Sequence, residues 1–297
     1  MSDNTSYRKG FRNDYKKSVP ILEALAKDIK FGWNDLIYWL FNGFNLPSII
    51  AFPDFPSKRT TLFKIAKRYK YRLTNKILSK PDLVVYFHDS THGDNGALKR
   101  LYPQKNIINI NCIDISKKKV DEIHSTVFGY NTFINPLTYS GVAVLKSDLN
   151  AMHDGRKIDC PVNHIEGGGV YQLLINNDCG NDLVMDYRVV VIGNAVPIVY
   201  KKFKAMENRF TNVVERSELC NTSQLLESQE VDSIIKFSRA IGADFCELDV
   251  LRNKDDNKIY VIDVNKTPYG PPAGLPHDQT KKAVEILSTT FYKEFLK

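Results

Sequence analysis

Two neighbouring segments near the C-terminus constrain the fold of this chain more than any other part. Residues 244–251 and 259–268 are rich in apolar and β-branched residues, and a short charged stretch, 252–258, separates them. Both segments are typical of strands and the stretch between them is typical of a turn, so we predict a β-hairpin. Asp263 and Asn265 are two positions apart and face the same side of the second strand.

The predicted hairpin also brings Asp249 close to Asp263 and Asn265, which places two carboxylates and one amide oxygen on one surface. Such a set suits a hard cation. Mg²⁺ in particular binds through one or two carboxylates, while substrate phosphates and water complete its shell. The hairpin and the Pro/Gly-rich loop 266–274 after it therefore indicate Mg-nucleotide chemistry, with Mn²⁺ as an alternative ion.

Composition indicates an ordinary globular protein. The chain has 297 residues, of which 43% are hydrophobic and 25% charged, which is enough for a large core and two or three subdomains. Its five cysteines are scattered and form no CxxC pair, so neither a zinc ribbon nor a disulfide framework is indicated. The polar N-terminus lacks the apolar core of a secretory signal, and we expect a cytoplasmic protein.

The net charge of +7 is unevenly distributed. Residues 1–80 hold 16 Lys and Arg against 6 Asp and Glu, whereas the remainder holds 25 against 28. A basic front end can face nucleic acid, an anionic membrane or an acidic polymer such as a uronic-acid glycan. A solvated helix surface explains the same charges. We favour that explanation, and we do not expect nucleic acid as a partner.

Residues 1–46 form a basic and aromatic segment. We predict a helix over 19–31, with Pro20 in its first turn. The aromatic stretch 31–44 is too short and too interrupted to span a bilayer. It could lie at a membrane surface, or it could pack on the domain or on a second subunit of a homodimer. We favour packing.

Residues 48–127 alternate strand and helix patterns, which indicates a partly parallel sheet. We expect strands at 48–52, 82–87 and 106–110, and helices at 60–72 and from Ser116 to about Val127. His88, Asp89 and His92 follow the strand 82–87, at an end of the sheet where ligands gather. Their spacing singles out no metal, so a substrate-contacting or structural loop is the preferred interpretation.

The chain becomes strand-rich after residue 128. We predict strands at 129–136, 140–146, 171–175, 184–192 and 196–204, with a turn at Gly193–Asn194. Residues 228–242 have the pattern of an amphipathic helix, for which Ser228 is the expected N-cap and Gly242 the end. A last helix is expected over 281–296.

The segment 186–212 is unusually rich in charge for a structural hairpin. It holds an Asp-x-Arg pattern ending in Arg188, then lysines at 201, 202 and 204, and then Arg209 and Asn212. Lysines on a strand can neutralise phosphates, and arginine can clamp a carboxylate or an acyl phosphate through two hydrogen bonds. Alone, these charges could simply face water. Beside the predicted cation site, a role in binding is favoured.

The order of these motifs resembles the ATP-grasp superfamily, especially its glutathione-synthetase-like and ribosomal-protein glutamate ligase-like branches. The resemblance rests on the hinge 170–175, the Asp-x-Arg hairpin with its basic strand, Arg-x-x-Asn, a helix, and then Glu-Leu-Asp-Val-Leu and Ile-Asp-Val-Asn. It implies a chain of the α+β or α/β class with the ATP-grasp fold, in which two α+β subdomains flank an ATP cleft. The implied divisions are an N-terminal helical segment (1–46), a small α/β domain (47–127) and an ATP-grasp domain (128–297), whose subdomains are 128–175 and 176–297.

The resemblance also implies roles for individual residues in binding Mg-ATP. Asp249, Asp263 and Asn265 match the metal ligands; Gln172, Leu173, Leu174 and Ile175 match the adenine-binding hinge; Asp178, or Asn177, matches the ribose-binding position. Lys146 is the candidate for the α- and β-phosphates. Lys202 matches a basic residue near the transferred phosphoryl group, and Lys201 is its alternative at a one-residue shift.

Arg209 and Asn212 match the pair near the acyl phosphate, and Arg188 is assigned to the catalytic group with them. The chain departs from the family in its phosphate lid, because Ser147 follows Lys146 and only Gly155 interrupts the loop after it. Loop 147–155 is our lid candidate. Gly167–Gly169 could cradle phosphate, but a flexible connector is preferred there.

The implied activity is an ATP- and Mg²⁺-dependent carboxylate–amine ligase that passes through an acyl phosphate and releases ADP and phosphate. Its substrate would be an amino acid, a peptide or an acidic glycan. Phosphoryl transfer of this kind needs positioning and charge neutralisation rather than a protein nucleophile. Two alternatives are an ATP-grasp phosphotransferase, which would phosphorylate its acceptor, and a non-catalytic ATP-binding interaction protein.

Overall fold

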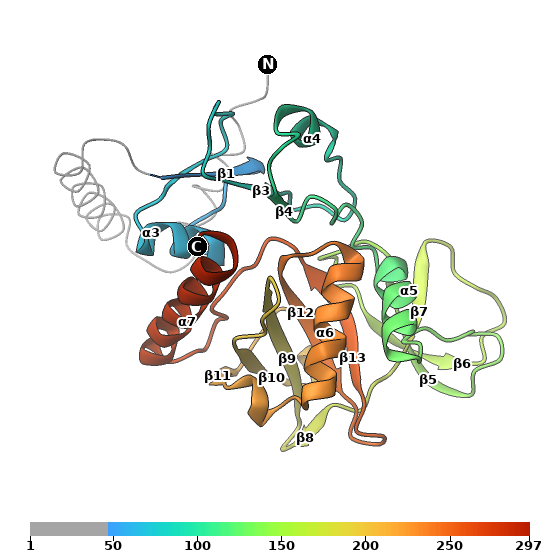
Figure 1. Ribbon diagram of the computed structural model, residues 1–297. Helices are drawn as coiled ribbons and strands as arrows, with labels where there is room; N and C mark the ends of the chain where they lie inside the picture. The colour runs from blue at the N-terminus through green and yellow to red at the C-terminus, as the bar shows by residue number, and fades with distance from the viewer. Residues whose placement is uncertain (1–46) are drawn as a thin grey trace, which may run out of the picture.

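The computed structural model describes residues 47–297, which form three β-sheets with helices packed around them (Figure 1). The helix expected at 19–31 and the aromatic stretch 31–44 lie outside the described residues. Within the described part, no helix is long and apolar enough to cross a membrane.

The first sheet is parallel, with the strand order β2-β1-β3-β4. Its strands are β1 (Ser48–Pro53), β2 (Arg72–Thr74), β3 (Leu83–Phe87) and β4 (Ile107–Ile108), and the helices beside it are α3 (Thr61–Arg68) and α4 (Gly96–Leu101). Every residue of β3 is buried. That explains its unbroken apolar sequence, because a parallel strand is normally covered on both faces.

The largest sheet is antiparallel, with the order β11-β10-β9-β12-β13 and the short β8 paired to β9. Its strands are β8 (Asp178–Gly180), β9 (Leu183–Ile192), β10 (Val199–Ala205), β11 (Arg216–Cys220), β12 (Phe245–Arg252) and β13 (Ile259–Asn265), and the single turns η1 (Met206–Asn208) and η2 (Thr222–Gln224) belong to its connections. Helices α5 (Lys117–Phe128) and α6 (Ser228–Ile241) pack on one face, and α7 (His277–Phe295) packs on the other.

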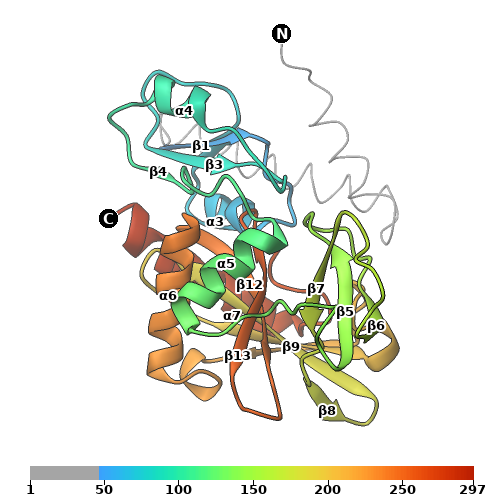
Figure 2. The ribbon, with the colours of Figure 1, turned by 90° about the vertical axis from the view of Figure 1, so that its right-hand side faces the viewer.

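The smallest sheet is also antiparallel, with the order β6-β5-β7. It consists of β5 (Gly141–Ser147), β6 (Arg156–Cys160) and β7 (Gly169–Leu173). In the turned view these three strands stand together on one side of the large sheet (Figure 2). The chain passes from β7 into β8, so residues 174–177 connect the two antiparallel sheets.

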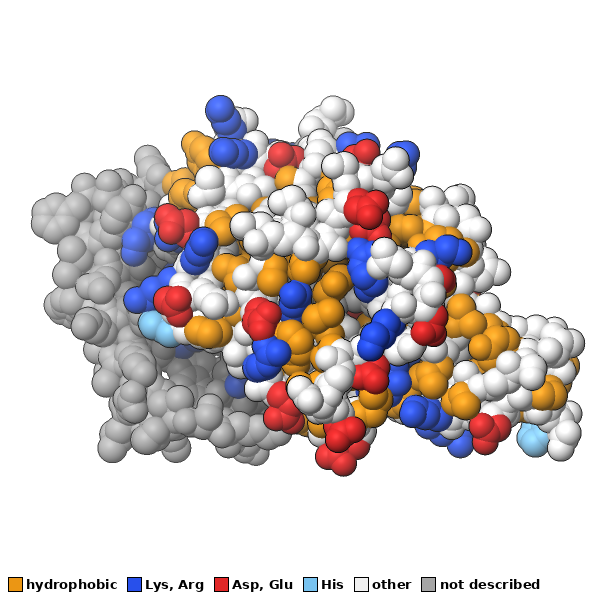
Figure 3. All heavy atoms as spheres, turned by 90° about the horizontal axis from the view of Figure 1, so that it is seen from below, with side chains coloured by type: hydrophobic (Ala, Val, Ile, Leu, Met, Phe, Trp, Pro, Cys, Tyr) orange, Lys and Arg blue, Asp and Glu red, His pale blue; other side chains and the backbone are white. Residues whose placement is uncertain are grey.

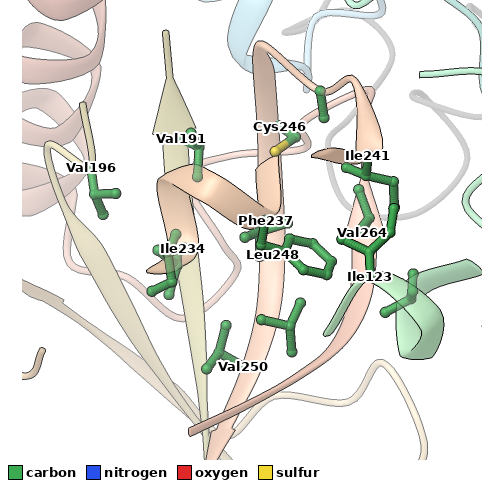
Figure 4. Packing of buried hydrophobic residues seen from close by; sticks show 14 of the residues in the cluster. Ile123, Val191, Val196, Ile234, Phe237, Ile241, Cys246, Leu248, Val250 and Val264 are labelled. Atoms are coloured by element: carbon green, nitrogen blue, oxygen red, sulfur yellow. The ribbon is translucent and has the colours of Figure 1, made fainter. Parts of the chain in front are cut away.

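The main core lies between the large sheet and α6. Ile234, Phe237 and Ile241 of α6 point toward Val191 and Leu248 of the sheet (Figure 4). Because these helix positions recur every three or four residues and the strand positions every two, each element presents one apolar stripe to the other. Gly242 ends α6 in the left-handed conformation, as expected for a helix C-cap.

A second core covers part of the opposite face of the same sheet. Val190, Ile192 and Phe245 pack there against Leu287 and Phe291 of α7. This core continues into α3 and β1, so it joins the parallel sheet to the large one. The remainder of this face carries charged side chains, which form the candidate site described below.

The face seen from below in Figure 3 mixes Lys and Arg with Asp, Glu and hydrophobic side chains, so no single charge dominates it. In the described part of the basic front end, residues 47–80 hold nine Lys and Arg against one Asp. Two of these cations hold α3 to the C-terminal region. Lys64 Nζ donates to the Gly270 carbonyl at 2.5 Å, and Arg68 pairs with Glu285 at 3.0 Å.

Most predicted elements are confirmed, including the hairpin, but the strand at 129–136 is wrong. A single bridge joins Phe133 to Gln172 in that region. The side chain of Asp121 instead accepts hydrogen bonds from the backbone N–H groups of Thr132 and Phe133, at 2.7 and 3.0 Å. Because a side chain takes the donors that a ladder would use, no regular strand forms.

Other corrections concern element ends and short strands. Glu227, not Ser228, is the N-cap of α6, since it forms a capping box with Glu230. Helix α3 ends at Arg68, earlier than expected, and α7 begins at His277, earlier than expected. The strands β2, β6, β8 and β11 and the helix α4 were not predicted; all of them are short.

Helix α5 lies at the predicted boundary between the 47–127 and 128–297 domains. Its buried residues Val120 and Ile123 belong to the same core as α6 and the large sheet. By packing, α5 is therefore part of the larger unit. The division of the chain into domains remains a prediction.

Candidate functional site

The candidate site is a charged region on one face of the large sheet. Across the ladders, Arg188 lies opposite Asp249, and Asp249 lies opposite Asp263. Residues that face one another in an antiparallel ladder project from the same side, as do residues two apart on one strand. The strands β9, β10, β12 and β13 therefore direct one set of polar side chains to one surface: Asp186, Arg188, Lys202, Lys204, Glu247, Asp249, Asp263 and Asn265.

Asp249 is held by two cations. Its Oδ1 accepts hydrogen bonds from Lys202 Nζ at 2.8 Å and from Arg188 Nε at 3.1 Å, and its Oδ2 accepts one from Arg188 Nη2 at 3.3 Å. Burial by itself would raise the pKa of Asp249, but Arg188 and Lys202 outweigh it and hold that pKa well below its ordinary value. Asp249 is therefore a carboxylate at neutral pH.

Lys202, not Lys201, faces this region. Lys202 is 4% exposed, and its pKa is lowered, mainly by burial and in spite of the attraction of Asp249. Lys201 is its neighbour on β10 and so projects from the opposite face, where it lies across from Tyr187. Next to Lys202 on the charged face, Lys204 pairs with Asp186 at 2.9 Å.

Asp263 and Asn265 have their own partners. Lys117 Nζ donates to Asp263 Oδ1 at 2.8 Å, and Asn265 Oδ1 accepts the N–H of Thr267 at 2.9 Å. Lys146 on β5 approaches from the smaller sheet. Its pKa is lowered to about 8, first by burial and then by Lys117, while Asp263 and Asp249 act in the opposite direction. Both antiparallel sheets thus contribute cations to one site.

The predicted adenine hinge contains both structural and accessible residues. Gln172 is 3% exposed, and its Nε2 donates to Thr132 Oγ1 at 2.8 Å. The backbone N–H of Leu173 donates to the Thr132 carbonyl at 2.8 Å. Ile175 is buried in a small cluster with Leu251 and Tyr260, whereas Leu174 is half-buried.

Asn177 is buried, and its Nδ2 donates to Asp186 Oδ1 at 2.9 Å, which ties the hinge to the charged face. The half-buried Asp178 accepts the N–H of Gly180 at 2.7 Å.

Arg209 and Asn212 are not brought to Asp249. Arg209 Nη2 donates to the Ile175 carbonyl at 3.1 Å and to Asn177 Oδ1 at 2.9 Å, so Arg209 lies at the hinge. Asn212 Nδ2 contacts His153 Nε2 at 2.7 Å, on the loop that we predicted as a lid. A hollow of about 700 Å³ lies beside Arg209, and it is lined by Arg156, Lys157, Asp182, Ala205, Met206, Glu207, Arg209 and Phe210.

Residues 147–155, the lid candidate, bridge several parts of the site. The Asp148 carbonyl accepts the N–H of Lys117 at 3.0 Å, and the N–H of Asn150 donates to Thr91 Oγ1 at 2.8 Å. Together with the contact between His153 and Asn212, these bonds hold the loop against α5 on one side and the 206–212 segment on the other.

The residues 88–92 do not form a metal site. His88 Nδ1 contacts Tyr86 OH and Ser90 Oγ, at 3.2 and 3.1 Å, and Asp89 accepts a hydrogen bond from Thr267 Oγ1 at 3.2 Å. Within residues 47–297 no group of three or more His, Cys, Asp and Glu side chains could hold a metal ion. A cation bound at the hairpin would therefore need Asn265 and oxygens from a substrate.

Comparison with known proteins identifies the fold. Residues 156–272 match the family model of the RimK-like ATP-grasp domain. The chain has the ATP-grasp fold. The matched segment contains the hinge, the basic strand and the hairpin, so it covers most of the predicted site residues, and the expected ATP-grasp fold is confirmed. No curated protein matches the sequence.

Two solved structures show how far this ATP-grasp fold extends. One is the ATP-grasp ligase PsnB in complex with a precursor peptide and AMPPNP, at 12% identity and a TM-score of 0.52, covering 83% of this chain and 98% of that one. Another is the D-alanine–D-alanine ligase of Bacillus anthracis complexed with ATP, at 12% identity and a TM-score of 0.53, covering 84% and 97%. At these identities the similarity establishes the fold alone. The expected enzyme class, an ATP-dependent ligase, agrees with both.

The oxygen donors of the candidate site fit a divalent cation. Asp249 and Asp263 face each other across β12 and β13, and Asn265 lies on the same face. Hard oxygen donors with room for substrate phosphates are what Mg²⁺ requires. Each carboxylate already contacts a lysine or an arginine, so the charges of the site are balanced without the ion.

Lys117 is a residue of the candidate site that sequence reasoning missed. It is 6% exposed and lies at the first position of α5, beside the N-cap Ser116. A cation is unfavourable there, because the helix dipole makes the N-terminus partly positive. A lysine directly after a capping serine was therefore a usable signal in the sequence, although only the fold shows that it reaches Asp263.

Proposed function

We propose that the protein is an ATP- and Mg²⁺-dependent ligase that joins a carboxylate to an amine. The γ-phosphoryl group of ATP passes to the carboxylate oxygen, which gives an acyl phosphate and ADP. The amine nitrogen then attacks the acyl carbon, the C–O bond to phosphate breaks, and an amide and inorganic phosphate leave. The observation that carries this proposal is the set of opposed carboxylates and buried lysines on one face of an ATP-grasp domain.

Asp249, Asp263 and Asn265 would hold Mg²⁺ in this proposal. When bound, the ion would neutralise phosphate charge and orient the nucleotide. The chain's own cations complete that task. Lys202, Lys117 and Lys146 all face the region where the phosphates would lie; Lys202 and Lys117 are buried, and Lys146 is half-buried. Ionic interactions are stronger there than at the surface, since the local dielectric constant is lower.

The nucleotide base belongs at the hinge. We propose that the half-buried Leu173 and Leu174 present their apolar side chains to adenine, while Gln172 and the buried Ile175 support the hinge, and that Asp178 lies near the ribose. Arg209 lines the hollow of about 700 Å³ and also bonds to the hinge, and Asn212 contacts His153 of the lid candidate, so we keep both as site residues. Arg188 lies beside Asp249 and is proposed to act on the transferred phosphoryl group.

We propose that the acceptor substrate is an amino acid or a peptide, and that the loop Lys266–Gly274 recognises it. PsnB, one of the similar structures, was solved with a precursor peptide. The loop lies next to the metal ligands because it continues directly from β13. A polyanionic glycan is less favoured, since Lys64 and Arg68 of the basic front end are engaged with the C-terminal region.

The direct test is a screen for ADP and phosphate release in the presence of ATP, Mg²⁺ and candidate amino acids, peptides and uronic acids, with mass spectrometry of the products. A ligase releases both ADP and phosphate and forms a product heavier by the joined amine. Substrate labelled with ¹⁸O in its carboxylate should transfer one ¹⁸O to phosphate. A phosphorylated product without free phosphate would instead identify a phosphotransferase and refute the ligase proposal.

A further inference from the structure

Glu247 is a buried carboxylate without a hydrogen-bond partner among the described residues. It lies on β12 two positions before Asp249, it is 1% exposed, and neither of its carboxylate oxygens accepts a hydrogen bond. Removing a carboxylate from water is costly unless other groups satisfy it. Because nearly all buried polar groups in proteins are bonded, an unbonded one needs an explanation.

The surroundings of Glu247 are polar but incompletely paired. Arg188 Nη1 lies 3.5 Å from Glu247 Oε2, which makes an ion pair but exceeds ordinary hydrogen-bond length. The backbone of Gly270 covers the other oxygen so closely that a Cβ there would lie 2.5 Å from it. The buried Tyr200 hydroxyl and Thr61 Oγ1 also lack hydrogen-bond partners in this part of the chain.

Arg188 thus lies between two carboxylates and bonds to only one of them. Its Nε and Nη2 donate to Asp249 at 3.1 and 3.3 Å, while its remaining terminal nitrogen points toward Glu247. The Arg188 side chain is 19% exposed, and a guanidinium does not lose its proton in proteins. If Asp249 releases Arg188, the cation therefore needs another anion close by.

We propose that the Arg188 guanidinium moves its hydrogen bonds from Asp249 to Glu247 when Asp249 binds Mg²⁺. This inference rests on the proposed function. The ion would repel the guanidinium, and it would bind to the same Asp249 oxygens that accept hydrogen bonds from Arg188 in this structure. Glu247 offers two free oxygens, and a shift of less than about 1 Å brings the pair into the range of a charge-assisted hydrogen bond. Glu247 is then a positioning residue: it lowers the cost of freeing Asp249 and keeps Arg188 at the site.

The variant Glu247→Gln tests this inference, because it keeps the shape and removes the charge. Binding of a non-hydrolysable ATP analogue is measured by calorimetry over a series of Mg²⁺ concentrations and in EDTA. The Mg²⁺ concentration needed for half-maximal tightening should rise about 10-fold or more, as when other supporting residues of metal ligands are lost. Affinity in EDTA and the metal-free melting temperature should not fall, because Glu247 accepts no hydrogen bond in the metal-free protein and the cost of burying its charge offsets its 3.5 Å ion pair with Arg188.

Glu230→Gln is the matched control. Glu230 lies on α6, over the opposite face of the sheet, and pairs with Arg252 at 2.7 Å. Its loss should lower the melting temperature and leave the Mg²⁺ dependence unchanged.

An unchanged Mg²⁺ dependence of analogue binding in Glu247→Gln would overturn the inference. A lower melting temperature of the metal-free variant would overturn it too, as would an effect confined to the KM of the acceptor. A wild-type protein that binds the analogue without any Mg²⁺ dependence would refute the proposed function itself.

Discussion

Asp249 on β12 lies directly opposite Asp263 on β13, and each carboxylate is held by a lysine from a different part of the chain. Lys202 reaches Asp249 at 2.8 Å from the neighbouring strand β10, and Lys117 reaches Asp263 at 2.8 Å from the start of α5. Two like charges face each other at the hairpin because cations from both sides offset their repulsion. This arrangement leads to the following predictions.

Asp263→Ala and Asn265→Ala should each abolish Mg-ATP turnover and leave the fold intact. Both residues are partly exposed at the site, so truncation removes a metal ligand without opening the core. Phosphate release and the melting temperature are the measurements. Full activity in either variant would contradict the assignment of the metal ligands.

Lys202→Met should lower turnover about 100-fold, the usual cost of removing one charge-stabilising donor from an active site. Lys201→Met is the matched control, because its side chain projects from the opposite face of β10. It should retain activity within about 2-fold, as expected for a residue outside the site. Steady-state kinetics of both variants show whether turnover depends on the lysine that projects into the site or only on the local positive charge. Equal losses of turnover in the two variants would contradict the assignment of Lys202 to the site.

Lys117→Met should weaken nucleotide binding about 10-fold to 100-fold, the cost of losing one hydrogen bond to a charged group. Its neighbour Lys118 has a side chain that is 69% exposed, so Lys118→Met should bind nucleotide as the wild type does. Calorimetry with a non-hydrolysable ATP analogue measures both. Normal binding by Lys117→Met would mean that this lysine serves only to hold Asp263.

Stability should decrease at acidic pH because of His124. This side chain is fully buried among Phe128, Tyr130 and Tyr260, its ring nitrogens lack hydrogen-bond partners in the described part of the chain, and burial lowers its pKa from 6.5 to about 4. Between these values the unfolded chain binds the proton and the folded chain does not, so the free energy of unfolding falls as pH falls. The loss at pH 4 should be on the order of 3 kcal/mol.

Chemical denaturation at pH 7 and at pH 4.5 checks this expectation. His124→Phe should lose that part of the pH dependence, whereas His92→Gln should keep it, since the side chain of His92 is 62% exposed. A wild-type protein with equal stability at both pH values would show that His124 is not the cause.

Much of the charged face follows from local rules that the sequence carries. Strand periodicity alone places Asp263 with Asn265 and separates Lys202 from Lys201, because side chains alternate along a strand. The charged turn at 252–258 fixes the hairpin, and the hairpin pairs Asp249 with Asp263. These relations span few residues and need no knowledge of the remaining fold.

Tertiary structure alone decided the contacts between distant segments. Lys117 meets Asp263 across 146 positions of the chain, and this happens because the apolar residues of α5 pack on α6 and the large sheet. Asp121 accepts hydrogen bonds from the backbone N–H groups of Thr132 and Phe133, which prevents the strand that the local pattern predicted. Arg209 bonds to the hinge rather than lying beside Asp249. Local periodicity determines which face a side chain takes, whereas its partner on another element depends on how the cores pack.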